Sequence, residues 1–207
     1  MKETRGQAFT LEGLTAGLVL VTAVLFAVQS VAVTPTTGGA IDERVQSDTR
    51  AEAKDILTSV AANESFGLSE LVRYWSPDAL TFQGAINTRI GYGDRRPPGE
   101  LGVLLEEVFT ARGETYNIEV EYQRKNISNG TRSITMVYRG EPSDDAVTVS
   151  QVVTLYDNQT LTAPSSSRAR LRQYDTNATN SEASYYPIPN AVNGTVYNVV
   201  KVRVTVW

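Results

Sequence analysis

The feature that most constrains this chain is a long, mostly apolar run, Gly13–Val33, which contains no charged residue. A helix rises about 1.5 Å per residue, so about 20 residues cross the roughly 30 Å hydrocarbon core of a bilayer. Lys2 and Arg5 precede the run, and the next basic residue after it is Arg44. The positive-inside bias therefore predicts a single-pass anchor, with the N-terminus in the cytoplasm and everything after about Thr34 outside.

Three interpretations of this segment remain open. A cleaved secretory signal would use Ser30-Val31-Ala32 as a small-residue cleavage site. A plain anchor would keep the whole segment, and a third type of leader would lose a short polar piece and keep the apolar helix. Glu12 favours retention, because a carboxylate at the edge of a membrane span is costly and normally has a partner there.

The residues from Arg5 to Glu12 (Arg-Gly-Gln-Ala-Phe-Thr-Leu-Glu) resemble the leader of the type IV pilin superfamily, and that of pilin-like, membrane-anchored surface proteins of halophilic archaea. That leader is a short basic stretch, a small residue, a Phe-Thr-Leu-like segment and a glutamate directly before a hydrophobic helix. The resemblance implies cleavage after Gly6, which makes Glu12 the sixth residue, or after Gln7, which makes it the family's fifth. It also implies that Glu12 pairs with the charged N-terminus of a neighbouring subunit.

Two sets of residues on the apolar segment predict contact with another helix. Thr15, Thr22 and Gln29 recur every seven residues and so share one stripe of a helix. Gly13 and Gly17 form a G-x-x-x-G pair near its start. Small residues and interhelical hydrogen bonds are the usual means of packing helices in lipid. We therefore expect the helix to contact membrane lipid and either another copy of the chain or another pilin-like subunit.

Composition narrows the function classes. The chain has no cysteine and no histidine, which removes disulfides, thiolate nucleophiles, most zinc sites and the commonest general base. Its net charge of −4 gives no basic field for nucleic acid. Glu106 and Glu107 are adjacent and point apart on a helix, and Asp144 and Asp145 are too few for a calcium site. We expect no enzymatic activity, no cofactor and no metal, and the sequence identifies no small-molecule substrate.

Six N-x-S/T triplets follow the apolar segment and are the acceptor motif for N-linked sugars. A chain rich in asparagine and threonine produces some of them by chance. Their spread over the whole downstream region nevertheless favours an exported glycoprotein. The six candidate glycosylation sites are Asn63, Asn126, Asn129, Asn158, Asn177 and Asn193.

The residues after the apolar segment predict one α+β domain. Proline and glycine interrupt the helical pattern just beyond the membrane, where we expect a hinge. Ile41, Val45, Ile56, Leu57 and Val60 then fall near one face of a helix that ends at about Ala62, and the stripe is thin in its middle. This helix should therefore lie on a sheet along only part of its length. The predicted boundaries are 1–12 for the leader and cytoplasmic stub, 13–33 for the transmembrane helix, 34–40 for the hinge and 41–207 for the extracytoplasmic domain.

Period-two alternation after Gly113 predicts an antiparallel sheet of four or more strands. Two short helices precede it, at 68–74 and before Gly113. The expected strands cover about 116–122, 134–138, 147–155 and 196–207, and the last carries Val200, Val202, Val204 and Val206 inward. A thirty-residue segment, 158–189, should hold a short strand or pack on the sheet.

The first two strands are predicted to form a hairpin with a three-residue loop, Ser128–Gly130. This loop places Tyr122 opposite Met136 and Val120 opposite Tyr138, so both apolar sets share one face. It also leaves Gly130 at a left-handed position, which such loops require.

Two functions from different classes are consistent with this organisation. The chain could be a structural or minor subunit of a type IV pilus-like surface assembly, with its helix in a filament and its sheet domain outside. The alternative is a stand-alone single-pass membrane protein whose exterior domain binds a partner or an envelope component. Both place the protein in the cell membrane with an extracellular C-terminal domain.

Overall fold

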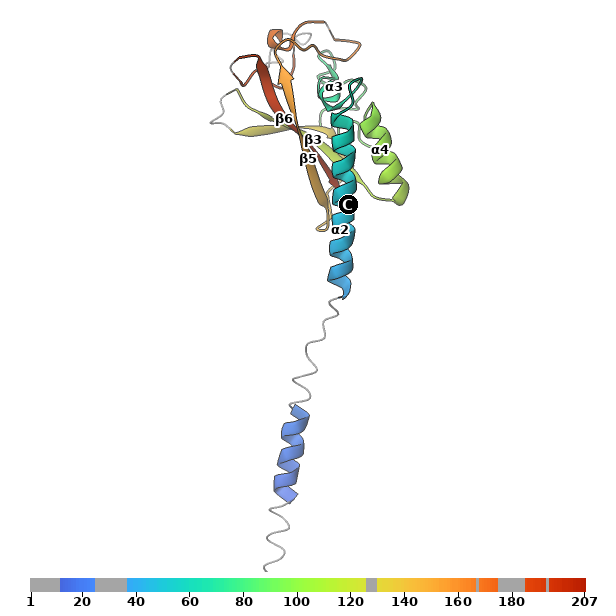
Figure 1. Ribbon diagram of the computed structural model, residues 1–207, viewed down its shortest axis with the longest axis vertical. Helices are drawn as coiled ribbons and strands as arrows, with labels where there is room; N and C mark the ends of the chain where they lie inside the picture. The colour runs from blue at the N-terminus through green and yellow to red at the C-terminus, as the bar shows by residue number, and fades with distance from the viewer. Residues whose placement is uncertain (1–11, 25–36, 126–129, 167, 175–184, 193) are drawn as a thin grey trace, which may run out of the picture. The chain divides into compact units, whose positions relative to one another are not determined.

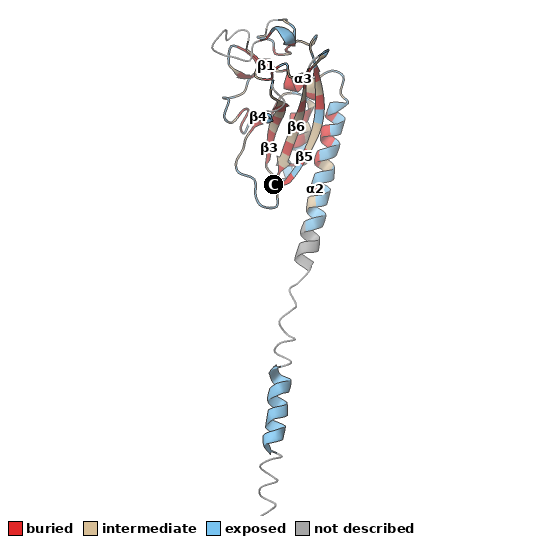
Figure 2. Cartoon of the chain, turned by 90° about the vertical axis from the view of Figure 1, so that its left-hand side faces the viewer, coloured by how far each residue is buried: buried red, intermediate tan, exposed pale blue. Residues whose placement is uncertain are grey.

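The computed structural model of this 207-residue chain describes residues 12–24, 37–125, 130–166, 168–174, 185–192 and 194–207 (Figure 1). The chain divides into two compact units, Met1–Arg44 and Val45–Trp207. In the first unit, residues 12–24 form a helix in which every side chain is exposed (Figure 2). The predicted transmembrane segment 13–33 is therefore described only as far as residue 24. Among the helices of the described ranges, none is both long and apolar enough to cross a membrane.

The second unit is built on a four-stranded antiparallel sheet, which confirms the predicted α+β class and the predicted strand type (Figure 1). The spatial order of the strands is β4-β3-β6-β5, so the last strand in the sequence lies in the middle. The strands are β3 (Tyr116–Gln123), β4 (Thr131–Val137), β5 (Val147–Tyr156) and β6 (Val196–Val206).

Helices and one small hairpin complete this unit, and the first of these helices begins in the other unit. Their side chains join those of the sheet in one hydrophobic core, to which Leu57, Leu105 and Val202 all belong. The sequence did not predict the two-stranded hairpin. The elements are α2 (Thr37–Ala61), α3 (Leu68–Val72), β1 (Trp75–Ser76), β2 (Thr81–Phe82), α4 (Glu100–Val108) and two 3-10 turns, η1 (Thr110–Arg112) and η3 (Leu171–Gln173).

Helix α2 is buried along only part of its length, as its thin apolar stripe predicted (Figure 2). Apolar residues at 53, 56, 57 and 60 follow helical spacing and are all buried, with Leu57 fully so. The sequence places Val45 on the same face, but 56% of its surface is exposed. The helix also begins at Thr37, inside the segment 34–40 that was expected to be a hinge.

The sheet has one apolar face and one charged face, which is typical of an antiparallel sheet covered on one side. The inward valines of β6 at 200, 202, 204 and 206 are buried as predicted. On the opposite face, Arg203 Nη2 lies 2.5 Å from Glu121 Oε2 and its Nη1 lies 3.6 Å from Glu119 Oε2. Lys201 Nζ adds a third ion pair with Glu121, at 3.8 Å. These cross-strand pairs give the open face alternating charge.

The β3–β4 hairpin has a different register from the one predicted. Tyr122 pairs with Arg132 and Val120 pairs with Ile134, so the predicted partner Met136 was wrong. Seven residues, 124–130, separate the two strands instead of three. The shift is four residues, an even number, so the inward and outward faces of β4 are unchanged and the apolar pattern cannot distinguish the two registers.

The end of this hairpin that lies away from its loop contains a β-bulge. Ile118 pairs with Val137 while Glu119 pairs with Thr135, which leaves Met136 as the extra residue, and both Met136 and Val137 are buried. The strand stops at Val137, so Tyr138 is not the inward strand residue that was expected. The left-handed conformation predicted for residue 130 is confirmed by its φ of +74°.

The described parts of segment 158–189, which was predicted to hold a short strand or to pack on the sheet, contribute side chains to the core. Buried Leu161, Leu171 and Ile188 all belong to the core. The hydroxyl of Tyr186 donates to the carbonyl of Val72 at 3.2 Å, which ties the segment to α3. Residues 160 and 170 form an isolated antiparallel bridge within the described part of this segment.

An exposed ion pair connects α2 to η1 and gives a small, pH-dependent prediction. Arg112 Nη1 donates to Glu52 Oε1 at 3.3 Å, and this hydrogen bond holds the pKa of the Glu52 carboxyl below its ordinary value near 4.5. Because the folded pKa is lowered, the contribution is present above 4.5 and is lost as the pH falls through the folded pKa. Glu52→Gln should therefore lower the free energy of unfolding by less than about 1 kcal/mol at pH 7, since both side chains are exposed.

Urea unfolding of the parent and of Glu52→Gln at pH 7 and pH 3 measures this difference. The matched control is Glu107→Gln, which changes an exposed carboxylate of α4 that has no ion pair with a described residue. A difference for Glu52→Gln that stays the same at pH 3 would show that the charge of the carboxylate is not the cause.

Candidate functional site

The helix of residues 12–24 is the part of the first unit where the predicted site residues can be placed. Its large side chains are exposed all round, including Leu14 (74%), Leu18 and Val21. A helix that is apolar on every side normally has apolar surroundings, either in a protein core or in lipid. This surface is therefore one that other apolar groups are expected to cover.

The threonines of the predicted stripe have acceptors within their own helix. Thr15 Oγ1 donates to the carbonyl of Glu12 at 2.9 Å, and Thr22 Oγ1 donates to the carbonyl of Leu18 at 2.7 Å. Such bonds to the preceding turn are common for hydroxyl side chains in helices. These hydroxyls do not need a second helix as an acceptor, so the stripe is weaker evidence for a partner than the sequence suggested. Gln29, its third member, lies outside the described residues.

The glycine pair lies on an open surface of the helix. A Cβ atom added to Gly13 or to Gly17 would meet no atom within 4 Å among the described residues, so the helix surface is open at both positions. Glu12 is also exposed at the start of the described helix. The predicted cleavage residues Gly6 and Gln7 lie outside the described residues.

Residues 5–206 match a family described as "Family of unknown function (DUF7288)". The chain belongs to this family. No curated protein and no solved structure matches it. The DUF7288 match begins at Arg5, so it includes the segment that resembles a pilin leader together with the α+β domain.

Two of the six candidate glycosylation sites lie in the described part of this DUF7288 chain. Asn63 Nδ2 donates to Glu100 Oε2 at 2.6 Å, while its Oδ1 accepts from the backbone N–H of Ser65 and of Phe66. The nitrogen that would carry a sugar is thus engaged in a turn that precedes α3. Asn158 is exposed in the turn after β5 and is the more accessible of the two. The other four, Asn126, Asn129, Asn177 and Asn193, lie outside the described residues.

One member of each acidic pair considered for chemistry makes a structural contact. Glu106 Oε2 lies 3.7 Å from Arg96 Nη1, and Asp145 Oδ1 accepts a hydrogen bond from Gln46 Nε2 at 3.5 Å. In the part of the chain that the structure describes, no three acidic side chains gather in a way that could hold a metal ion.

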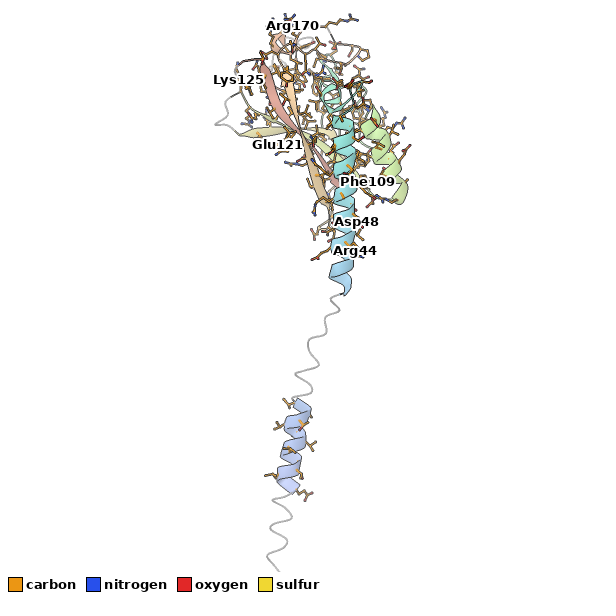
Figure 3. The ribbon with its side chains drawn as sticks, in the orientation of Figure 1. Arg44, Asp48, Phe109, Glu121, Lys125 and Arg170 are labelled. Atoms are coloured by element: carbon orange, nitrogen blue, oxygen red, sulfur yellow. The ribbon has the colours of Figure 1, made fainter. Side chains whose placement is uncertain are left out.

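Sequence reasoning missed a basic pocket of 330 Å³ at the hairpin end of the DUF7288 sheet. It lies where β3 ends, where β4 begins and where the segment before β6 passes. Its position can be followed from Lys125, labelled at the end of β3 in Figure 3. We call it the hairpin pocket; its lining residues are Tyr122, Arg124, Lys125, Arg132, Tyr185, Pro187 and Pro189. Pairing of β3 with β4 could have predicted that the three cations lie together. Tyr185, Pro187 and Pro189 come from the segment before β6, and no local sequence pattern predicts where that segment packs.

Proposed function

We propose that this chain is a non-enzymatic, membrane-anchored protein of the cell surface that serves as a type IV pilin-like structural or minor subunit. The observation that carries the proposal is the helix of residues 12–24, apolar on all sides and exposed, with Glu12 at its start. The α+β domain, by contrast, closes its apolar residues into one core. The helix is thus the surface of the chain for which apolar surroundings are needed.

Three further observations support a retained helix. The family match starts at Arg5 and so spans the leader-like residues, the apolar segment and the sheet domain together. The open surface at Gly13 and Gly17 allows another helix to approach the backbone closely. Glu12 supplies a carboxylate that can pair with the amino terminus of a neighbouring mature subunit, which offsets part of the cost of placing either charge in an apolar environment.

Mass spectrometry of the mature N-terminus, on protein purified from the membrane fraction, is the direct test. A terminus at Gln7 or Ala8 supports a pilin-like subunit. An intact Met1 supports a stand-alone anchor, and a terminus near Val33 contradicts both because the apolar segment would be lost.

Replacing the carboxylate tests assembly itself. Glu12→Gln should reduce the amount of the protein in sheared surface material by about tenfold or more, since the subunit amino terminus loses its charged partner. Glu43→Gln, an exposed carboxylate of α2, is the matched control and should leave that amount unchanged. Equal yields for both variants, with equal amounts in the membrane, would contradict a role for Glu12 in assembly.

The alternative function is a stand-alone single-pass protein whose exterior domain binds an envelope component. The hairpin pocket favours it, because an assembled filament subunit does not by itself require a basic cavity. The two functions differ in the maturation of the N-terminus and are compatible in the use of the pocket.

A further inference from the structure

The hairpin pocket collects positive charge in a chain that is negative overall. Of its described lining residues none is acidic, and three are cationic: Arg124, Lys125 and Arg132. None of the three forms an ion pair with any residue that the structure describes. A concave surface lined by one sign of charge concentrates its field and attracts ligands of the opposite sign.

The charged face of the same sheet shows that this arrangement differs from its surroundings. On β6, Lys201 and Arg203 are each paired with Glu121. The cations of the hairpin pocket, Arg132 on β4 and Arg124 and Lys125 just after β3, have no such acid beside them among the described residues. In addition, Arg124 Nε is buried and has no hydrogen-bond partner among the described residues, so its guanidinium is incompletely satisfied.

Hydrogen bonds to neighbouring strands hold one wall of the pocket in place. Both tyrosines line the pocket; Tyr122 is buried on β3, while Tyr185 is half-buried on the segment before β6 and has the more accessible ring. Asn198 Nδ2 donates to the carbonyl of Pro189 at 2.8 Å and also to that of Gln123 at 2.9 Å. Tyr197 donates its hydroxyl hydrogen to the carbonyl of Ile188 at 2.7 Å.

These bonds attach the proline wall to the central strand β6 and to the end of β3. Proline itself fixes its backbone, so the wall has little freedom left to lose. A pocket whose lining is held before the ligand arrives loses less conformational entropy on binding.

We propose that the hairpin pocket binds an acidic saccharide, a sugar ring that carries a carboxylate or sulfate group. The cations provide charge-assisted hydrogen bonds to the acid group. The half-buried ring of Tyr185 provides flat apolar surface for the C–H face of the sugar, and a cavity of 330 Å³ suits one or two rings. An acidic peptide carries its carboxylate on a flexible stem and would leave the tyrosine and proline walls unused.

Isothermal titration of the full chain with trigalacturonate, at low salt and in detergent, tests this assignment. Arg132→Gln and Tyr185→Ala should each weaken binding by about tenfold or more. Arg132 is exposed, so its replacement leaves the fold intact, and an unchanged midpoint of thermal unfolding verifies this. Arg50→Gln, an exposed position on α2 with the same change in charge, should keep the parent affinity.

The ligand controls separate the parts of the assignment. Maltotriose, a neutral saccharide, should not bind measurably, and tetraglutamate should bind at least about tenfold more weakly than trigalacturonate. Absence of trigalacturonate binding overturns the proposal. Tetraglutamate binding as tight as that of trigalacturonate also overturns it, because the pocket would then suit acidic peptides. A loss of affinity in Arg50→Gln equal to that in Arg132→Gln overturns it as well, because overall charge would then explain the effect. The pocket lies within Val45–Trp207, so these outcomes are independent of N-terminal maturation.

Discussion

Gly91→Ala is expected to destabilise the α+β domain by more than about 3 kcal/mol, which is a large part of the stability of a typical domain. A Cβ atom at this position would lie 1.9 Å from the carbonyl oxygen of Met136 and 2.4 Å from its carbonyl carbon. Both are backbone atoms of β4 and its bulge, so no side-chain rotation relieves the overlap. The same carbonyl accepts the N–H of Tyr92 at 2.8 Å, and moving it would weaken that bond as well.

Gly84→Ala is the control that separates the steric overlap at residue 91 from the strain of a left-handed backbone conformation. Gly91 has a φ of +60° and Gly84 a φ of +80°, so alanine is strained at both. At Gly84 an added Cβ meets no described atom within 4 Å, and only the strain of about 1–2 kcal/mol remains. Urea unfolding of the two variants measures the difference. Equal losses would show that the approach to Met136 is not tight enough to matter.

Leu57→Ala should lower the free energy of unfolding by about 2–5 kcal/mol, the range for truncating a buried leucine. Leu57 is fully buried at the centre of the part of α2 that joins the core. Its loss leaves a cavity between the helix and the sheet. Val45→Ala on the same helix removes apolar atoms from a side chain that is 56% exposed, and it should change stability by less than about 0.5 kcal/mol.

Denaturant unfolding of the two α2 variants distinguishes the buried part of the helix from the exposed part. A loss for Val45→Ala comparable to that for Leu57→Ala would mean that the N-terminal part of α2 also has a packing partner. An unchanged slope of unfolding free energy against denaturant would show that neither replacement alters the compactness of the domain.

The sequence predicted those elements whose pattern is local and repeated. The alternating valines of β6 and the apolar spacing in the second half of α2 each have one solution that buries them. The hairpin register was wrong because a shift of four residues leaves the inward set of β4 unchanged, and a bulge then buries both Met136 and Val137. The β1–β2 hairpin, with two residues in each strand, is too short to show any period.

The candidate sites divide in the same way. The apolar N-terminal segment and Glu12 are visible in a continuous stretch of residues, and so they could be singled out without a fold. The hairpin pocket needs Tyr185 and Pro189 beside Arg132, and only tertiary packing brings them together. The glycosylation motif at Asn63 can be recognised in the sequence. The hydrogen bond from Asn63 to Glu100 cannot, because it joins segments that are far apart in the sequence.

The central place of β6 also sets the order in which the domain can fold. Strands β3 and β5 do not pair with each other, and both pair with β6. The pair Tyr116 and Val206 joins the first residue of β3 to the last residue of β6. A chain that emerges N-terminus first can form its helices and the β3–β4 hairpin early. It cannot close the sheet until β6 has been released. Such long-range pairing gives a high contact order and slow folding, during which the apolar faces of β3 and β5 are open to chaperones or to aggregation.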